Sequence, residues 1–114
     1  MAYDEHLADR VRAALDTSAD VSERKMFGGL AFMVAGHMAC GVVGDDLMLR
    51  LGEEGADAAL DEPHTRPMDF TGKRMKSMVY VAPAGTATDA ALLAWVKRAT
   101  AHARTLPPKQ DQSR

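Results

Sequence analysis

The chain has 114 residues, which suits one domain rather than two, and its apolar content of 46% is ordinary for a globular protein. Its net charge is −2, but residues 1–65 carry five Lys/Arg against thirteen Asp/Glu, a balance of −8, whereas residues 66–114 carry nine against three, a balance of +6. Folding either mixes these charges or leaves a dipolar surface that steers partners.

The single cysteine excludes an intrachain disulfide. The acidic N-terminus lacks an apolar signal core and no apolar run approaches the about 20 residues of a membrane span, so we expect a cytoplasmic protein without membrane contact.

The first expected element is a helix over residues 4–16. Its apolar residues recur at helical spacing and form one stripe, which consists of Leu7, Val11, Ala14 and Leu15. Asp4 and Glu5 stand near its start, where the helix dipole favours negative charge. The pattern therefore predicts a helix with one face packed on the rest of the domain.

From about residue 23 to residue 51 the apolar period changes to two, which predicts strands. The expected strands are 24–27, 30–35, 38–43 and 47–51, and glycine-containing turns separate them. Connections this short require antiparallel neighbours, so these strands are expected to form a meander. Between residues 30 and 43 both phases are apolar, so this part of the sheet is either covered on both faces or exposes an apolar face.

The next segment is less regular. Residues 53–60 allow a short helix, although Gly55 counts against it. Residues 62–76 contain two prolines and a glycine and are expected to form a long polar loop. Residues 76–82 return to strand character, which brings the expected sheet to about five strands.

A final helix is expected to run from a cap at Thr86 or Thr88 to about residue 104. Its apolar stripe consists of Leu92, Val96, Ala99 and Ala103, with Trp95 beside it. Residues 106–114 are polar, contain two prolines and are expected to form a disordered tail. The expected fold is α+β, an antiparallel meander sheet flanked by an N-terminal and a C-terminal helix, in one domain over residues 1–105.

No residue pattern predicts catalysis, a metal or a cofactor. Cys40 lies in an apolar strand, where a thiol behaves as a small hydrophobe. His37 is three residues away and points to the other face of a strand, so the two do not form a metal-binding pair. The Asp45-Asp46 pair follows a glycine and is typical of a turn.

Methionine is unusually frequent, with eight residues in the chain. Most lie in or near the expected sheet, where methionine either fills an irregular core or lines an adaptable binding surface. Met33 and Met48 are expected on the less covered face of the sheet. They are therefore candidate contacts for a protein partner, or for a second copy in a homodimer.

A basic segment suggests a second kind of partner. Its four candidate residues are Arg66, Lys73, Arg74 and Lys76. Arg24 and Lys25 are expected to join them in space if the fold permits. Such a patch can contact the phosphates of a nucleic acid, although only Phe70 is available nearby for base stacking.

Several short motifs appear in a fixed order along the chain. They are Met26-Phe27-Gly28-Gly29, the Gly36-x-Met38-Ala39 hairpin, Leu47-Met48-Leu49-Arg50, Arg66-Pro67-Met68, Tyr80-Val81 and Trp95 in the last helix. This ordered set, over about residues 5–104, resembles the N-terminal domain of the TfoX/Sxy family, named for regulators of bacterial competence.

The resemblance implies an antiparallel sheet flanked by helices and a link to transcriptional regulation. The family supplies no agreed catalytic residues. Its full-length regulators carry a second, C-terminal helical domain, which we do not expect in this chain. The sequence therefore favours a non-enzymatic interaction or regulatory module, and a weak nucleic-acid-binding regulator that uses the basic 66–76 segment is the alternative.

Overall fold

The computed structural model describes residues 3–15, 21–26, 28–70 and 73–106, with the side chains at 26, 69, 70 and 73–75 left out. The described strands are β1 (Val21–Met26), β2 (Gly29–Val34), β3 (His37–Val43), β4 (Asp46–Arg50), β5 (Thr65–Phe70) and β6 (Lys73–Val81). The described helices are α1 (Glu5–Leu15), α2 (Gly52–Leu60), the 3-10 helix η1 (Pro83–Thr86) and α3 (Asp89–Thr105). The expected tail falls, from residue 107 on, outside the described part.

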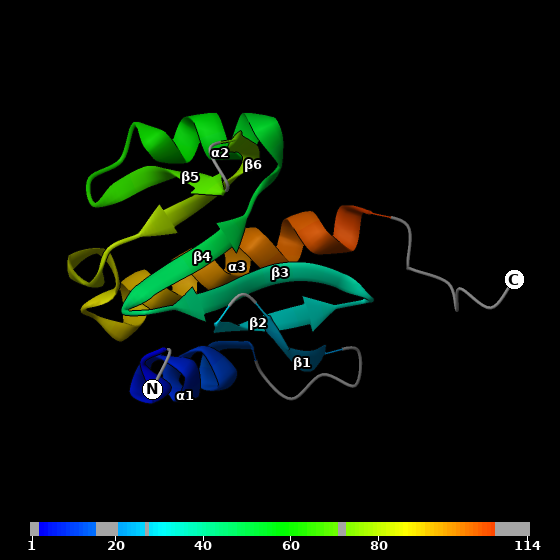
Figure 1. Cartoon of the computed structure of the whole chain (residues 1–114), viewed down its shortest axis with the longest axis vertical. Helices are drawn as coiled ribbons and strands as arrows, with labels where there is room; N and C mark the ends of the chain where they lie inside the picture. The colour runs from blue at the N-terminus through cyan, green and yellow to red at the C-terminus, as the bar shows by residue number, and fades with distance from the viewer. Residues whose placement is uncertain (1–2, 16–20, 27, 71–72, 107–114) are drawn as a thin grey trace, which may run out of the picture.

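The six strands form one antiparallel sheet in the order β1-β2-β3-β4-β6-β5 (Figure 1). The first four strands follow one another as the expected meander. After β4 the chain passes through α2 and the edge strand β5, and β6 then returns to pair between β4 and β5. The α+β fold class is confirmed.

The expected loop over residues 62–76 is wrong, because β5 and the start of β6 occupy most of it. Pro67 pairs with Val79 at the edge of the sheet, where a missing N–H group on the outer side breaks no ladder bond. The register shifts between Pro67 and Met68, so a bulge interrupts the alternation that would have revealed the strand. Within the described residues the sheet has six strands, where about five were expected.

The turn between β2 and β3 shows why the hairpin is tight. Ala35 and Gly36 have φ angles of 52° and 85°. Two positive φ angles are typical of a type I′ turn, whose twist matches that of the flanking strands. The turn fixes the antiparallel pairing of Val34 with His37.

The main core lies between one face of the sheet and the helices. In Figure 1, α3 runs behind β3 and β4, and α1 lies beside it at the β1–β2 side. The largest fully buried side chains of the main core include Phe32, Leu47, Leu49, Leu92, Val11, Val34, Val42, Val79, Val81 and Val96. The expected stripes of both terminal helices supply their share of this core, so their orientation is confirmed.

Side-chain caps fix the starts of both terminal helices. The Asp4 carboxylate accepts hydrogen bonds from the N–H groups of His6 at 2.9 Å and Leu7 at 3.2 Å. Of the two expected caps of α3, Thr88 is the one used, since its hydroxyl accepts from Ala91 N at 3.1 Å. Thr86 is instead buried at the end of η1.

Candidate interaction surfaces

The face of the sheet that points away from the main core has its own cluster of methionines. The strand register aligns one row across this face, formed by Arg24, Ala31, Gly41, Met48, Tyr80 and Arg66. Every buried residue of the three α-helices belongs to the main core, whereas this cluster contains strand residues alone. We call it the methionine face and define it by Met33, Met38, Met48, Met68 and Met78.

Met33 and Met48 both lie on the methionine face but differ in exposure. Met33 is partly exposed, whereas Met48 is only 3% exposed. Met68 and Met78 pack against it, with Met38, Val43 and Tyr80 around the rim. Gly41 leaves space for this packing, because a Cβ at that position would lie 2.7 Å from Met48 Cε.

Arginine and tyrosine close one side of the methionine face. The Arg66 guanidinium donates to Asp46 Oδ2 at 2.6 Å and lies over the Tyr80 ring, 4.6 Å from its centroid. Its hydrogen bond to the Asp46 carboxylate raises the pKa of Arg66 above its ordinary value. Half of the Arg66 side chain remains exposed. Arg66 therefore covers Tyr80 while presenting its free edge to solvent.

Further cations share this face. Arg24 lies on the methionine face because it pairs with Ala31. Arg50 and Lys76 lie there because each is two residues from a methionine of that face, Met48 in β4 and Met78 in β6. Arg24 and Lys76 are exposed, and Arg50 is partly exposed. Among the side chains that the structure describes, Asp46 is the one carboxylate that the register places here. The accessible part of the methionine face is therefore positively charged.

The expected basic cluster is only partly assembled. Arg66 lies in β5, and Lys73, Arg74 and Lys76 lie in the first half of the adjacent strand β6. The side chains of Lys73 and Arg74 lie outside the described part. Arg24 and Lys25 do not join this group, since β1 and β5 are opposite edges of the sheet. Five strand spacings separate the two edges by about 24 Å along the sheet.

A groove between α1 and α3 forms a second surface, which sequence reasoning missed. It encloses about 410 Å³, and its lining residues are Asp9, Arg10, Ala13, Ala14, Asp89, Leu92 and Leu93. Arg10 donates to Thr86 O at 2.8 Å and to Asp89 Oδ1 at 3.2 Å, which holds the two helices together at one end. The doubled leucine at 92 and 93 was the available signal, since Leu93 lies beside the buried stripe.

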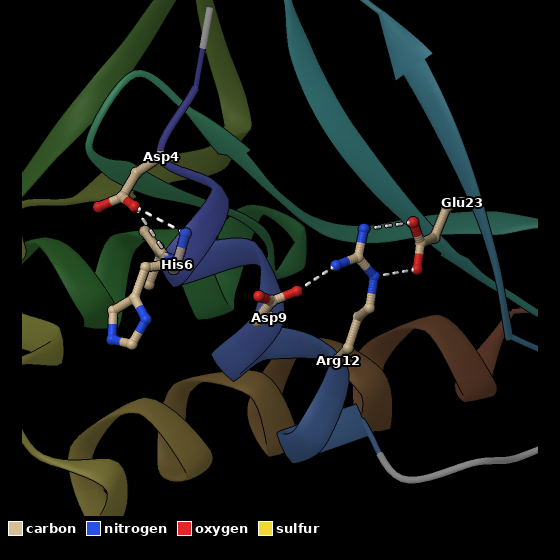
Figure 2. Close-up of polar contacts among 6 residues, drawn as sticks. Asp4, His6, Asp9, Arg12 and Glu23 are labelled. Atoms are coloured by element: carbon tan, nitrogen blue, oxygen red, sulfur yellow. Dashed lines mark hydrogen bonds and ion pairs between the residues drawn. The ribbon is translucent and has the colours of Figure 1, made fainter. Parts of the chain in front are cut away.

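A fork of hydrogen bonds ties α1 to the edge strand β1. Figure 2 shows Arg12 reaching both Asp9 and Glu23. The distances are 2.6 Å from Arg12 Nη1 to Asp9 Oδ1, 2.5 Å from Nε to Glu23 Oε2 and 2.9 Å from Nη2 to Glu23 Oε1. The hydrogen bond from Arg12 lowers the pKa of Glu23. This contact anchors β1 beside the helix layer.

The uneven charge of the two chain halves is partly neutralised on folding. Arg10–Asp89 joins the two halves with the charges reversed, whereas Asp46–Arg66 and Glu62–Arg98 pair carboxylates of the acidic first half with cations of the basic second half. The N–O distances are 3.2, 2.6 and 2.7 Å. All three involve exposed groups, so each stabilises the fold by at most about 1 kcal/mol.

Reactive groups are not gathered in the described part of the chain. Cys40 is fully buried, and burial raises the pKa of its thiol to about 12. A thiol that stays protonated at neutral pH is a poor nucleophile. Within the described residues no three His, Cys, Asp or Glu side chains group as metal ligands, and no helix combines the length and apolar character that a membrane crossing needs.

These features define a class, an α+β domain with a one-sided helix layer, whose two distinctive features are a cationic sheet face and a groove between helices. The model of the TfoX N-terminal domain matches residues 13–103, which is most of the chain. The chain therefore belongs to the TfoX N-terminal domain family. No curated protein and no solved structure matches it.

Proposed function

We propose that the protein is a non-enzymatic regulatory module whose methionine face binds an acidic, partly apolar segment of a protein partner. Membership of the TfoX N-terminal domain family supports a regulatory role. The observation that carries the proposal is the coincidence of methionines with three accessible cations, Arg24, Arg50 and Lys76, on one sheet face that none of the described helices covers. Methionine side chains adapt to varied apolar partners, and the surrounding cations favour a partner that carries carboxylates.

The same geometry favours a protein over a nucleic acid. Tyr80 is the one described aromatic side chain in the methionine cluster, and Arg66 already lies over its ring. Among the described side chains, a base therefore lacks an open stacking platform on this face. Arg66 is also paired with Asp46, which reduces the charge available to a phosphate.

The test uses two neighbouring residues of the edge strand β1. Arg24 pairs with Ala31 on the methionine face, whereas Lys25 pairs with Leu30 on the main-core face, and both are exposed. The probe is a labelled amphipathic helical peptide with glutamate on one side and leucine on the other, and binding is followed by fluorescence anisotropy. We expect Arg24→Glu to weaken binding by about fivefold, the equivalent of about 1 kcal/mol, with less than half that effect for Lys25→Glu.

Equal losses from the two charge reversals would contradict the assignment, because both change the net charge by the same amount. Failure of the wild-type chain to bind the peptide at low ionic strength would remove the proposal itself. Thermal unfolding of both variants serves as the control, since exposed charges on an edge strand change stability little.

A weak nucleic-acid-binding regulator is the second candidate. The observation in its favour is that four basic residues, Arg66, Lys73, Arg74 and Lys76, belong to the two adjacent strands β5 and β6. Titration of duplex DNA at increasing salt tests this candidate, because phosphate contacts weaken steeply with salt. If Lys73 and Arg74 are contacts, alanine at each lowers the salt slope by about one. Absence of binding at low salt eliminates the candidate.

A further inference from the structure

The outer surface of the helix layer combines a hollow with a protruding side chain. The groove between α1 and α3 has apolar walls formed by Ala13, Ala14 and Leu92. Leu93 stands at its edge and is 37% exposed, the one large hydrophobic side chain with this much exposure among the described residues. A leucine beside a hollow of this size can enter the same hollow on another copy of the chain.

The residues around Leu93 are arranged for contact with an antiparallel copy. Asp89, Leu93 and Lys97 lie four residues apart in α3 and therefore form one ridge along the helix. The Asp89 side chain is 96% exposed. Lys97 is exposed, and its ammonium has no ion-pair partner in the described part of the chain. The ridge thus carries a carboxylate, an apolar centre and an ammonium in order.

When two copies of this ridge pack antiparallel about a two-fold axis at Leu93, Asp89 of each copy lies opposite Lys97 of the other. Ala90 and Ala94 are exposed next to the ridge, so their small side chains allow a close approach of two helices. Arg10 already holds Asp89 at 3.2 Å, which positions the carboxylate at the rim of the groove. Apolar and charged groups are therefore complementary in the same symmetric arrangement.

We propose that the chain forms a symmetric dimer through this surface, with the two α3 helices antiparallel. Leu93 of each copy occupies the groove of the other, and Asp89 pairs with Lys97 of the second copy. The surface lies on the helix side of the sheet, so the dimer leaves both methionine faces free. One helix and one groove from each copy form the contact, and a contact of this extent implies a weak, concentration-dependent dimer.

Sedimentation equilibrium of the full chain from about 1 µM to 1 mM measures the dimer dissociation constant. We expect Leu93→Asp to raise this constant by at least about tenfold, because it removes the apolar centre and places two carboxylates at the two-fold axis. Ala58→Asp, on the exposed side of α2, adds the same charge elsewhere and should leave the constant unchanged. Circular dichroism verifies that both variants remain folded.

A charge exchange provides the second arm. Lys97→Asp alone and Asp89→Lys alone each place like charges opposite one another and should weaken the dimer severalfold. The double variant restores opposite charges at both ends and should recover most of the loss. A chain that stays monomeric over the whole range, a dimer insensitive to Leu93→Asp, or a double variant no tighter than the single ones would each overturn the proposal. Arg24→Glu, on the methionine face, should not affect the dimer, so failure here is distinguishable from failure of the proposed function.

Discussion

Gly41 makes the packing of the methionine face testable by the addition of one methyl group. In Gly41→Ala the new Cβ would lie 2.7 Å from Leu30 O, 2.7 Å from Met48 Cε and 3.3 Å from the Cα of Ala31. The end of Met48 can move, but Leu30 O belongs to the backbone of the neighbouring strand. Carbon–oxygen contacts across sheets are about 3.3–3.6 Å, so the two strands must separate by roughly 0.6 Å at this point.

Overpacking of this kind costs about 1–3 kcal/mol, and the loss of unfolded-chain entropy on replacing glycine offsets about 0.4–1 kcal/mol of it. We therefore expect a net loss of about 1–2 kcal/mol. At about 4 °C per kcal/mol for a domain of this size, Tm should fall by about 4–8 °C in scanning calorimetry.

Gly44→Asn is the matched control for this substitution. Nothing lies within 4 Å of a Cβ at Gly44, and asparagine tolerates its φ of +58°. We expect a change below about 0.5 kcal/mol. If Gly41→Ala is as stable as the wild-type chain, the close approach of the Leu30 carbonyl to Gly41 is wrong.

Three further predictions concern single groups. Because burial raises the pKa of the Cys40 thiol to about 12, the thiol should resist a disulfide reagent at pH 8 until the chain unfolds. The buried thiol's contribution to stability should be lost from pH 9 upward, and this pH-dependent loss should be absent in Cys40→Ala. Glu23→Gln should cost about 0.5 kcal/mol near neutral pH in urea unfolding; because Arg12 lowers the pKa of Glu23, the difference is present above its ordinary value of 4.5 and should vanish in stronger acid. Thr88→Ala should cost about 1 kcal/mol by removing the cap on Ala91 N, whereas retention of full stability would show that the cap is not formed.

The parts of the fold that sequence reasoning predicted correctly depend on local patterns. The strands β1 to β4 combine an apolar period of two with short turns, and the Ala35-Gly36 turn leaves antiparallel pairing as the sole solution. The terminal helices carry complete apolar stripes and side-chain caps. Each of these signals lies within a few residues of the element it specifies.

The parts that were missed depend on distant residues. The edge strand β5 contains Pro67 and a bulge, and only its pairing with β6 identifies it as a strand. The burial of Met48 depends on the absence of a side chain at Gly41 in the neighbouring strand and on Met68 and Met78 in two others. None of these contacts produces a periodic residue pattern in the sequence.

The groove between α1 and α3 was missed for the same reason, because it depends on residues far apart in the sequence. The residues that line it come from the two ends of the chain, and the Arg10–Asp89 contact joins groups 79 positions apart. The sequence does identify the methionines and most of the cations of the methionine face. It does not place Arg24 and Lys25 far from β5, because that requires the strand order.

Methionine methyl resonances report most directly on whether the methionine face is the binding surface. The full chain with labelled methyl groups is titrated with the glutamate–leucine peptide, and the spectra are followed by NMR. We expect the partly exposed Met33 and Met38 to shift together at the lowest peptide concentrations, while amide signals of α1 and α3 stay unchanged. Binding that moves the helix signals and leaves Met33 and Met38 in place would contradict it.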